Sequence, residues 1–235
     1  MDSLLEFDLE KVRASNVICG VDEAGRGPLA GPVSAAAVLL ESSFYEIAAE
    51  PLKSFPINDS KKLNGKQREI CFEQILRWSE EGLLRFANVM LGVEPIEKYN
   101  ILGATSLAME QCIEKLEKES TCQFSKKGEE SPDSVLVLID GRPVKRLSFA
   151  HEGIVKGDGK SMAIAMASII AKVSRDKVML ELHEKYPDYG FAAHKGYATK
   201  AHSEAILKHG PCPEHRPTFL RKLLGTEEQK LMDLK

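Results

Sequence analysis

The stretch VDEAGRGPLAGP at residues 21–32 constrains the chain most, because it joins two apolar runs through an acidic pair and three glycines. The runs NVICGV at residues 16–21 and VSAAAVLL at residues 33–40 predict buried strands. Asp22 and Glu23 therefore lie where a strand gives way to a tight turn, and the glycines supply the backbone freedom that such a turn needs. This arrangement predicts a functional site at the end of the first strand, with a plain charged turn as the alternative.

Apolar periodicity along the rest of the chain predicts both strands and helices. Strands are expected at about residues 84–91 and 134–139, with a short one near 152–155. One helix is expected over 64–81, more than one across 94–119, and one long helix over 161–185. Three strands come early and a parallel one follows a helical crossover, which predicts an α/β fold with a mixed sheet. The segment MAIAMASIIAKV of the last helix has small and apolar residues too closely spaced for a surface helix, so we expect that helix to be buried.

Two segments are expected outside this core. The polar stretch 120–134 has the composition of an exposed connection. After Tyr186, proline and glycine recur, which predicts short helices that are held by turns and packed onto the main domain. The last dozen residues are expected to form a short helix or a frayed tail.

Composition excludes several classes of protein. Of the 235 residues, 43% are hydrophobic and 29% are charged, as in ordinary soluble globular proteins. No apolar run approaches the roughly 20 residues that span a bilayer, and the first ten residues are acidic where a secretory signal is basic and then apolar. Five cysteines without CxxC spacing indicate neither a disulfide framework nor a zinc site. We expect a cytoplasmic monomer that has no membrane contact.

The net charge of −3 conceals an asymmetry along the chain. Residues 1–155 carry 18 basic and 25 acidic side chains, whereas residues 156–222 carry 12 basic and 7 acidic ones. A local basic face beside a carboxylate cluster suits an enzyme that cuts a polyanion, and a solvated helix face is the alternative. The histidines of the final third are expected at the surface, with a phosphate contact as the alternative; they are His194, His202, His209 and His215.

Three further motifs place an acid or a base directly after an apolar segment or in a glycine-containing loop. They are NDSKKL at residues 58–63, VLVLIDG at 135–141 and IVKGDGKS at 154–161. With GVDEAGRGPLAGPV, MASIIAKVSRD, YPDYGFAAHKGYATKAH and HRPTF, in that order, they make the chain resemble the type 2 ribonucleases H, specifically bacterial ribonuclease HII. The matching strings run from Gly20 to Phe219.

The resemblance implies a definite architecture. A ribonuclease-H-like mixed five-stranded sheet flanked by helices is expected to form a catalytic domain over residues 1–185. Residues 186–235 are expected to form a small C-terminal helical extension that packs on this core and helps to grip the substrate.

The resemblance also implies a set of metal-binding, catalytic acids: Asp22, Glu23, Asp140 and Asp158. Hard carboxylate oxygens suit Mg²⁺ or Mn²⁺, and two such ions are expected with substrate bound. Adjacent residues in a regular strand point to opposite faces. Glu23 can therefore contribute only if the strand has ended, or if its backbone carbonyl is the ligand.

The remaining expected site residues would bind substrate. In the family, the tripeptide Gly25-Arg26-Gly27 is associated with the 2′-hydroxyl beside the scissile phosphate, and Tyr197 matches a tyrosine that contacts the same ribose and stacks on the following deoxyribose. Phosphate contacts are expected from further polar side chains, namely Ser60, Lys61, Lys62, Lys172 and Arg175. Arg175 in a structural ion pair with Asp176 is the alternative for that side chain.

The function expected from the resemblance is that of a metal-dependent endoribonuclease. It would hydrolyse the RNA strand of RNA–DNA hybrids and incise duplex DNA on the 5′ side of an embedded ribonucleotide, leaving 3′-hydroxyl and 5′-phosphate ends. Two alternatives stay open. One is a different two-metal nuclease on the same fold, such as a DNA resolvase, and the other is a non-catalytic nucleic-acid-binding module.

Overall fold

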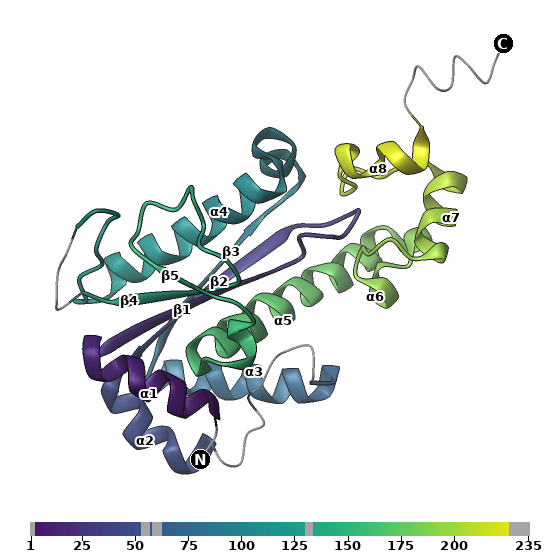
Figure 1. Cartoon of the computed structure of the whole chain (residues 1–235). Helices are drawn as coiled ribbons and strands as arrows, with labels where there is room; N and C mark the ends of the chain where they lie inside the picture. The colour runs from purple at the N-terminus through teal and green to yellow at the C-terminus, as the bar shows by residue number, and fades with distance from the viewer. Residues whose placement is uncertain (1–2, 53–56, 58–62, 130–133, 226–235) are drawn as a thin grey trace.

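A mixed five-stranded sheet forms the centre of the molecule (Figure 1). The computed structural model describes residues 3–52, 57, 63–129 and 134–225. The strands are β1 (Val17–Ala24), β2 (Val33–Glu41), β3 (Arg85–Leu91), β4 (Leu136–Asp140) and β5 (Glu152–Ile154), in the spatial order β3-β2-β1-β4-β5. The first three are antiparallel neighbours, and β4 and β5 extend the sheet in parallel with β1. The predicted α/β fold with a mixed five-stranded sheet is confirmed.

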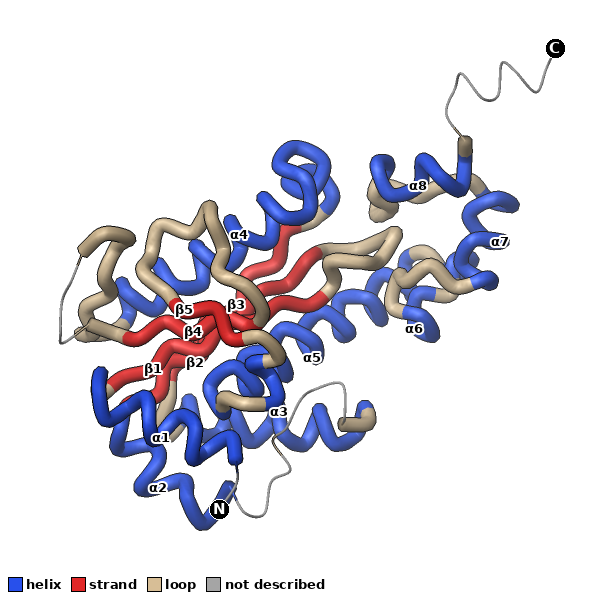
Figure 2. Tube along the Cα trace, viewed as in Figure 1, coloured by secondary structure: helices blue, strands red, loops and turns tan. Residues whose placement is uncertain are grey.

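Helices cover both faces of the sheet (Figure 2). One face packs against α1 (Ser3–Ser15), α2 (Ser42–Leu52), α3 (Gly65–Glu80) and α5 (Met162–Lys185), and the other packs against α4 (Val93–Glu119). Along β1, Ile18 belongs to the first core and Cys19 to the second, because successive side chains of a strand point to opposite faces. Burial on both faces explains why β1 and β2 appear in the sequence as continuous apolar runs.

Helix α5 lies directly on β1. A Cβ at Gly20 would overlap the backbone of Ala163, so the glycine allows the helix to approach the strand. The helix begins at the cap residue Ser161, whose side chain accepts a hydrogen bond from Ile164 N. Its first half is buried, which confirms the burial predicted from its small and apolar residues.

Two helices were absent from the sequence-based expectation. In α1, the carboxylate of Asp8 is buried among apolar side chains and accepts a hydrogen bond of 2.9 Å from Ala163 N at the start of α5. A buried acid interrupts the apolar stripe by which a helix is recognised. Helix α2 begins at Ser42, directly after β2 ends at Glu41, so no turn signal separates the two elements.

Helix α4 contains a kink at Asn100, where φ is 56°. The Asn100 side chain accepts hydrogen bonds from the backbone N–H groups of Leu102 and Gly103, at 3.0 and 3.1 Å, and so caps the longer second part of the helix. The sequence-based expectation of more than one helix over 94–119 agrees with this break.

The expectation of an exposed connection over 120–134 was wrong at Phe124 and Ser125, which are buried. Phe124 is buried, and its ring packs edge-on against that of Phe149, with ring centroids 5.9 Å apart. The aromatic residue can join the core on the α4 side of the sheet despite its polar neighbours. Residues 130–133 lie outside the described part of the chain.

After α5 come short helices and turns, as expected. They are α6 (Phe191–His194), α7 (Lys200–His209) and α8 (Pro217–Leu224), preceded by the 3₁₀ turn Pro187–Tyr189. A third core joins them to α5 and to the loop after β1 through six buried side chains: Ala30, Met179, Tyr189, Phe191, Ile206 and Leu220. The division at residue 185 stays a prediction, and the last ten residues lie outside the described chain.

The surface position expected for the late histidines was wrong for two of them. His202 and His215 are buried beside the third core, and their Nε2 atoms lie 3.1 Å apart. His215 also contacts the ring of Tyr189, with ring centroids 4.9 Å apart. Burial lowers the pKa of His215 to about 4, with a further contribution from His202. In the described part of the chain, no helix is both long and apolar enough to cross a membrane.

Candidate active site

Three aspartates from separate segments converge at the C-terminal ends of two neighbouring strands. Asp22 lies in β1, Asp140 is the last residue of β4, and Asp158 lies in the 3₁₀ turn Gly157–Gly159 just before α5. Because β1 and β4 are parallel neighbours, with Val21 opposite Ile139, the two strands deliver their acids to the same place. One carboxylate oxygen from each of the three lies within 4.8 Å of the others.

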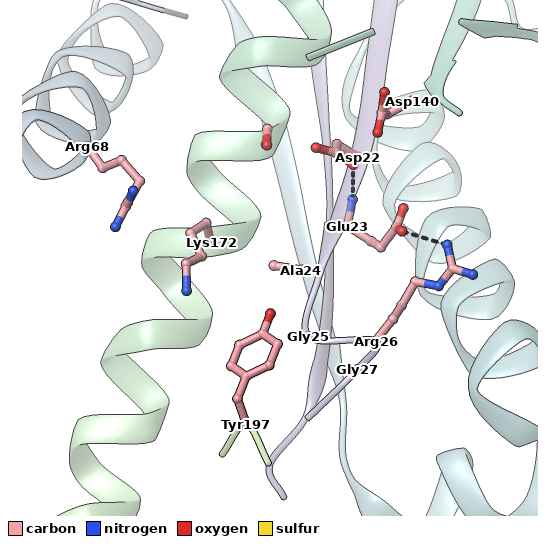
Figure 3. A pocket seen from close by; sticks show the side chains of 11 residues that line it. Asp22, Glu23, Ala24, Gly25, Arg26, Gly27, Arg68, Asp140, Lys172 and Tyr197 are labelled. Carbon is pink, nitrogen blue, oxygen red and sulfur yellow. Dashed lines mark hydrogen bonds and ion pairs between the residues drawn. The ribbon is translucent and has the colours of Figure 1, made fainter. Parts of the chain in front are cut away.

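Backbone N–H groups hold two of the aspartates in position, and Figure 3 shows the one that bonds Asp22. Asp140 Oδ1 accepts a hydrogen bond of 2.6 Å from Gly157 N, which links the end of β4 to the turn that carries Asp158. Asp22 Oδ1 accepts a hydrogen bond of 2.7 Å from Glu23 N. A Cβ at Gly157 would lie 2.6 Å from Ile164 Cδ1, so a larger residue here would have to displace the end of that side chain.

The cluster concentrates negative charge in a site with little access to water. Asp22 is 4% exposed and Asp158 is 3% exposed. Burial raises the pKa of Asp22 well above its ordinary value, and the carboxylates of Glu23 and Asp140 raise it further. A bound cation would offset this repulsion, and three converging carboxylates are the hard oxygen donors that Mg²⁺ and Mn²⁺ prefer. The residues present therefore fit a divalent metal ion.

Glu23 points away from this cluster. Strand β1 continues to Ala24, which pairs with Ser34, so the strand has not ended at the acidic pair. The Glu23 carboxylate forms an ion pair of 2.9 Å with Arg26 Nη1 instead of joining the three aspartates. Its expected role as a metal ligand, through the side chain or through the backbone carbonyl, stays a prediction.

A cleft of about 270 Å³ lies beside the aspartates. Its lining brings together residues that are far apart in the sequence: Asp22, Glu23, Ala24, Gly25, Arg26, Gly27, Arg68, Asp140, Ser168, Lys172 and Tyr197. Tyr197 is 44% exposed, and its ring lies across the cleft from the loop of the acidic pair (Figure 3). The expected glycine tripeptide and the expected tyrosine thus share one cavity with two of the aspartates.

Two buried arginines hold the loop that follows β1. Arg216 donates from Nη2 to the carbonyl oxygens of Gly25 and Gly31, at 2.7 and 2.8 Å, from Nε to Gly31, and from Nη1 to Arg26 at 3.2 Å. Arg175 donates to the carbonyl oxygens of three further residues, namely Ala30, Pro32 and Lys195. The carbonyl oxygens of the loop accept hydrogen bonds from two buried guanidinium groups. These bonds hold the loop backbone in place.

The burial of these cations has an electrostatic cost. Burial and, to a smaller extent, the neighbouring charge of Arg175 together lower the pKa of Arg216 to about 9. Carbonyl oxygens accept from charged donors in strong hydrogen bonds, which offsets part of that cost. A Cβ at Gly25, where φ is 89°, would overlap the Arg175 side chain, so this position requires glycine for both space and backbone conformation.

Comparison with known proteins agrees with this geometry. The sequence model of the family described as Ribonuclease HII matches residues 19–224. The chain belongs to the ribonuclease HII family. It is 45% identical over 208 residues to the ribonuclease HII of Caldicellulosiruptor bescii, with 88% of each chain covered. It is 50% identical over 203 residues to that of Endomicrobium trichonymphae, covering 86% of this chain and 84% of the relative.

A solved structure has the same fold. The ribonuclease H2 of Pyrococcus horikoshii OT3 superposes with a TM-score of 0.59 and 23% sequence identity, covering 91% of this chain and 98% of that one. Membership of the ribonuclease HII family makes the chain a ribonuclease H, an endonuclease that belongs to the hydrolases and binds metal.

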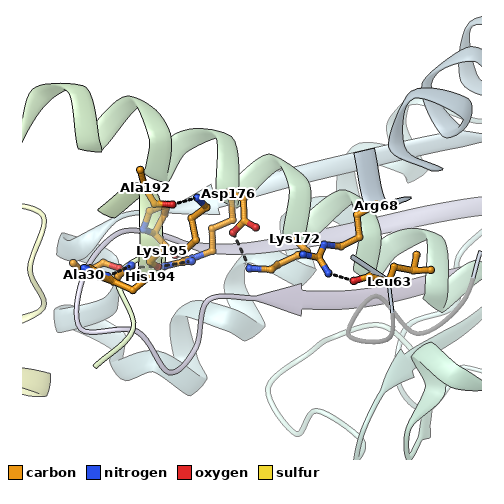
Figure 4. Close-up of polar contacts among 11 residues, drawn as sticks. Ala30, Leu63, Arg68, Lys172, Asp176, Ala192, His194 and Lys195 are labelled. Carbon is orange, nitrogen blue, oxygen red and sulfur yellow. Dashed lines mark hydrogen bonds and ion pairs between the residues drawn. The ribbon is translucent and has the colours of Figure 1, made fainter. Parts of the chain in front are cut away.

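The other predicted site residues lie at varying distances from the cleft. Lys172 lines it and forms an ion pair of 2.8 Å with Asp176 (Figure 4). Arg175 is fully buried, and its guanidinium bonds to backbone carbonyls rather than to Asp176, so its placement does not favour the expected phosphate contact. Ser60, Lys61 and Lys62 lie outside the described residues.

Sequence reasoning missed two side chains of this region. Arg68 of α3 lines the cleft and donates from Nη1 to the carbonyl oxygen of Leu63 (Figure 4). Arg216 lies beneath the loop, and its only signal in the sequence was its place in HRPTF, one of the strings shared with the family. Neither position carries a local pattern that distinguishes it from an ordinary surface base.

Proposed function

We propose that this enzyme hydrolyses the RNA strand of RNA–DNA hybrids and incises duplex DNA on the 5′ side of an embedded ribonucleotide. One observation carries the proposal: two members of the aspartate cluster, Asp22 and Asp140, border a single cleft together with the Gly25-Arg26-Gly27 backbone and Tyr197. The aspartates lie where the reacting phosphate would bind. The glycine-tripeptide backbone and the Tyr197 ring would recognise the adjacent sugar. An enzyme that cut any nucleic acid would not need them together.

The chemistry is hydrolysis of a phosphodiester. A water oxygen bonds to phosphorus, the bond from phosphorus to the 3′ oxygen breaks, and that oxygen takes up a proton. The products therefore carry a 3′-hydroxyl and a 5′-phosphate. Asp22, Asp140 and Asp158 would hold Mg²⁺ or Mn²⁺, and we expect two ions with substrate bound. Such ions make the attacking water more acidic and stabilise charge on the leaving oxygen.

Residues of the chain itself would recognise the sugar. The backbone of Gly25-Arg26-Gly27 lies in a loop fixed by Arg216, so its polar groups can meet a 2′-hydroxyl without reorganising. The Tyr197 ring would stack on the deoxyribose that follows, because an aromatic face packs well on a sugar that lacks the 2′-hydroxyl. Lys172 would lie near the strand and reduce the repulsion between phosphate and the acids.

The substrate would therefore be an RNA–DNA hybrid or a DNA duplex that contains a ribonucleotide, and the enzyme would act as a monomer in the cytoplasm. The basic balance of residues 156–222 supports contact with a polyanion. Size-exclusion chromatography with light scattering tests the monomeric state.

Cleavage of one labelled duplex with a single ribonucleotide tests the proposal. We expect metal-dependent incision at one position, immediately 5′ of the ribonucleotide, with a 3′-hydroxyl that a polymerase extends. The matched all-DNA duplex is the control and is expected to stay intact. Equal cleavage of both duplexes would favour a different nuclease on this fold. Tight binding without turnover, with either Mg²⁺ or Mn²⁺ present, would favour a non-catalytic nucleic-acid-binding module.

A further inference from the structure

A second cleft, of about 500 Å³, opens on the α4 side of the acids. It shares Glu23, Arg26 and Asp140 with the first cleft, and its other walls are α4 over residues 102–109 and the loop 141–146 between β4 and β5. Tyr197 and Lys172 border only the first cleft. The two hollows therefore extend from the aspartates in different directions.

The wall formed by the loop is strongly basic. Within the sequence RPVKR, three cations are exposed: Arg142, Lys145 and Arg146. Among the residues that the structure describes, none of these cations has a carboxylate within ion-pair distance. The three charges are thus available to a ligand, and together they outnumber the two acids that the clefts share.

The basic loop is held in one shape by its neighbours. Lys127 Nζ donates to the carbonyl oxygens of Val144 and Lys145, each at 3.0 Å. Val144 N donates to His151 Nε2 at 2.9 Å, and Ser148 N donates to the Glu110 carboxylate at the same distance. A loop that is braced in this way presents its charges with little further loss of entropy on binding.

The wall formed by the helix extends the hollow along α4. A smaller cleft of about 280 Å³ shares Ser106 and Arg146 with the basic one and reaches Tyr99. Arg146 lies across Gly103, where a Cβ would come 2.7 Å from its Nη1 atom, so the helix has no side chain in the way of the guanidinium. Leu102 is 59% exposed and Tyr99 is 40% exposed, which provides apolar surface beside the cations.

We propose that this groove binds the backbone of the cleaved strand on the 5′ side of the cut. The inference rests on the proposed function, because the direction follows from Tyr197. If Tyr197 contacts the ribonucleotide and the deoxyribose after it, the 3′ part of the strand occupies the first cleft. The 5′ part then leaves the aspartates past Glu23 and Asp140 and meets Arg142, Lys145 and Arg146, while the sugars face Leu102.

Paired variants test this groove. Arg142→Ala with Lys145→Ala removes two of its exposed charges, and Lys115→Ala with Lys118→Ala removes two exposed charges from the C-terminal part of α4, outside either cleft. Binding is measured by fluorescence anisotropy across a salt series without metal, on duplexes with a long or a short arm 5′ of the ribonucleotide. Cleavage with Mg²⁺ on the same duplexes gives kcat and KM.

With the long 5′ arm, we expect the groove variant to reduce the slope of log affinity against log salt by about two units. Its KM should rise, while kcat stays within about twofold, because the acids are unchanged. With the short 5′ arm, the variant and the unmodified enzyme should bind alike, and the control should match the unmodified enzyme throughout.

Two results would overturn the inference: an unchanged slope, or an equal loss on long and short 5′ arms. Failure of the proposed function would look different. The unmodified enzyme would then cut the ribonucleotide duplex and the all-DNA duplex equally or not at all, whereas the binding data would still report on the groove.

Discussion

Arg216 Nη2 donates a hydrogen bond of 2.7 Å to the carbonyl oxygen of Gly25, which lies 191 residues earlier in the chain. The bond connects the C-terminal helices to the loop that follows the acidic pair, and Arg175 reaches the same loop from α5. The two buried arginines therefore hold the loop backbone that is the candidate ribose-binding site. This arrangement makes distant residues contribute to the geometry of the cleft.

Arg216→Lys is expected to lower kcat/KM on a ribonucleotide-containing duplex by tenfold or more. Lysine keeps the charge but lacks the planar fork that bonds Gly25, Arg26 and Gly31 together. Hydrogen bonds to charged groups contribute about 1.5–3 kcal/mol each, so the loop should lose its fixed shape. Steady-state kinetics well below the melting temperature measure the loss.

Arg221→Lys, in exposed α8, is the matched control for that variant and should keep full activity. Circular dichroism checks that both proteins are folded. A folded Arg216→Lys enzyme with unchanged kcat/KM would show that the loop does not depend on this guanidinium.

Asp140→Asn is expected to reduce cleavage by at least about a hundredfold while hybrid binding persists. Asparagine keeps the shape, but it removes a negative charge from the cluster with Asp22 and Asp158. Single-turnover cleavage and anisotropy in the same buffer separate the two effects. Near-normal turnover with Mg²⁺ would contradict the assignment of Asp140 to the metal site.

Tyr197→Ala is expected to impair cleavage of single-ribonucleotide duplexes far more than cleavage of continuous hybrids. Stacking on an aromatic ring is worth about 1–3 kcal/mol, which corresponds to roughly tenfold to a hundredfold in kcat/KM. Tyr197→Phe keeps the ring, so its loss should be intermediate. The measurement is kcat/KM for each enzyme on both substrates. Equal losses on the two substrates would leave selection of the junction to the glycine tripeptide.

Asp8→Asn is expected to change how stability depends on pH. Burial raises the pKa of Asp8 from 3.8 to about 6, although hydrogen bonds from Tyr45 and Ala163 oppose part of the shift. Between these two values the folded protein binds more protons than the unfolded chain, so this group lowers the free energy of unfolding as pH rises. The loss approaches about 3 kcal/mol and levels off above the folded pKa.

Urea unfolding at several pH values tests that expectation. The stability of Asp8→Asn relative to the unmodified protein should increase from pH 4 to pH 6 and then stay constant. Glu10→Gln, on the exposed side of α1, is the control and should show no such trend. Parallel pH curves for Asp8→Asn and the unmodified protein would contradict the raised pKa of Asp8.

Local pattern was sufficient for most of the secondary structure. The apolar runs of β1 and β2 and the small residues of α5 act over a few neighbours, so they are visible in the sequence. Helix α1 was missed because one of its buried residues is Asp8, which is buried only in the presence of α5. A partner that is distant in sequence leaves no mark on local periodicity.

By itself, the sequence determined the strand that carries Asp22, the order of the acidic motifs and the membership of a nuclease family. Tertiary structure decided which of these residues meet. It carried Glu23 to the opposite face from Asp22, because β1 continues past both. It turned Arg175 inward although Lys172, three residues earlier, faces the cleft. Lys172 and Arg175 are both basic and lie on the same helix, so the sequence did not distinguish them. The position of the loop carbonyl oxygens, which accept hydrogen bonds from the Arg175 guanidinium, decided that Arg175 is buried while Lys172 lines the cleft.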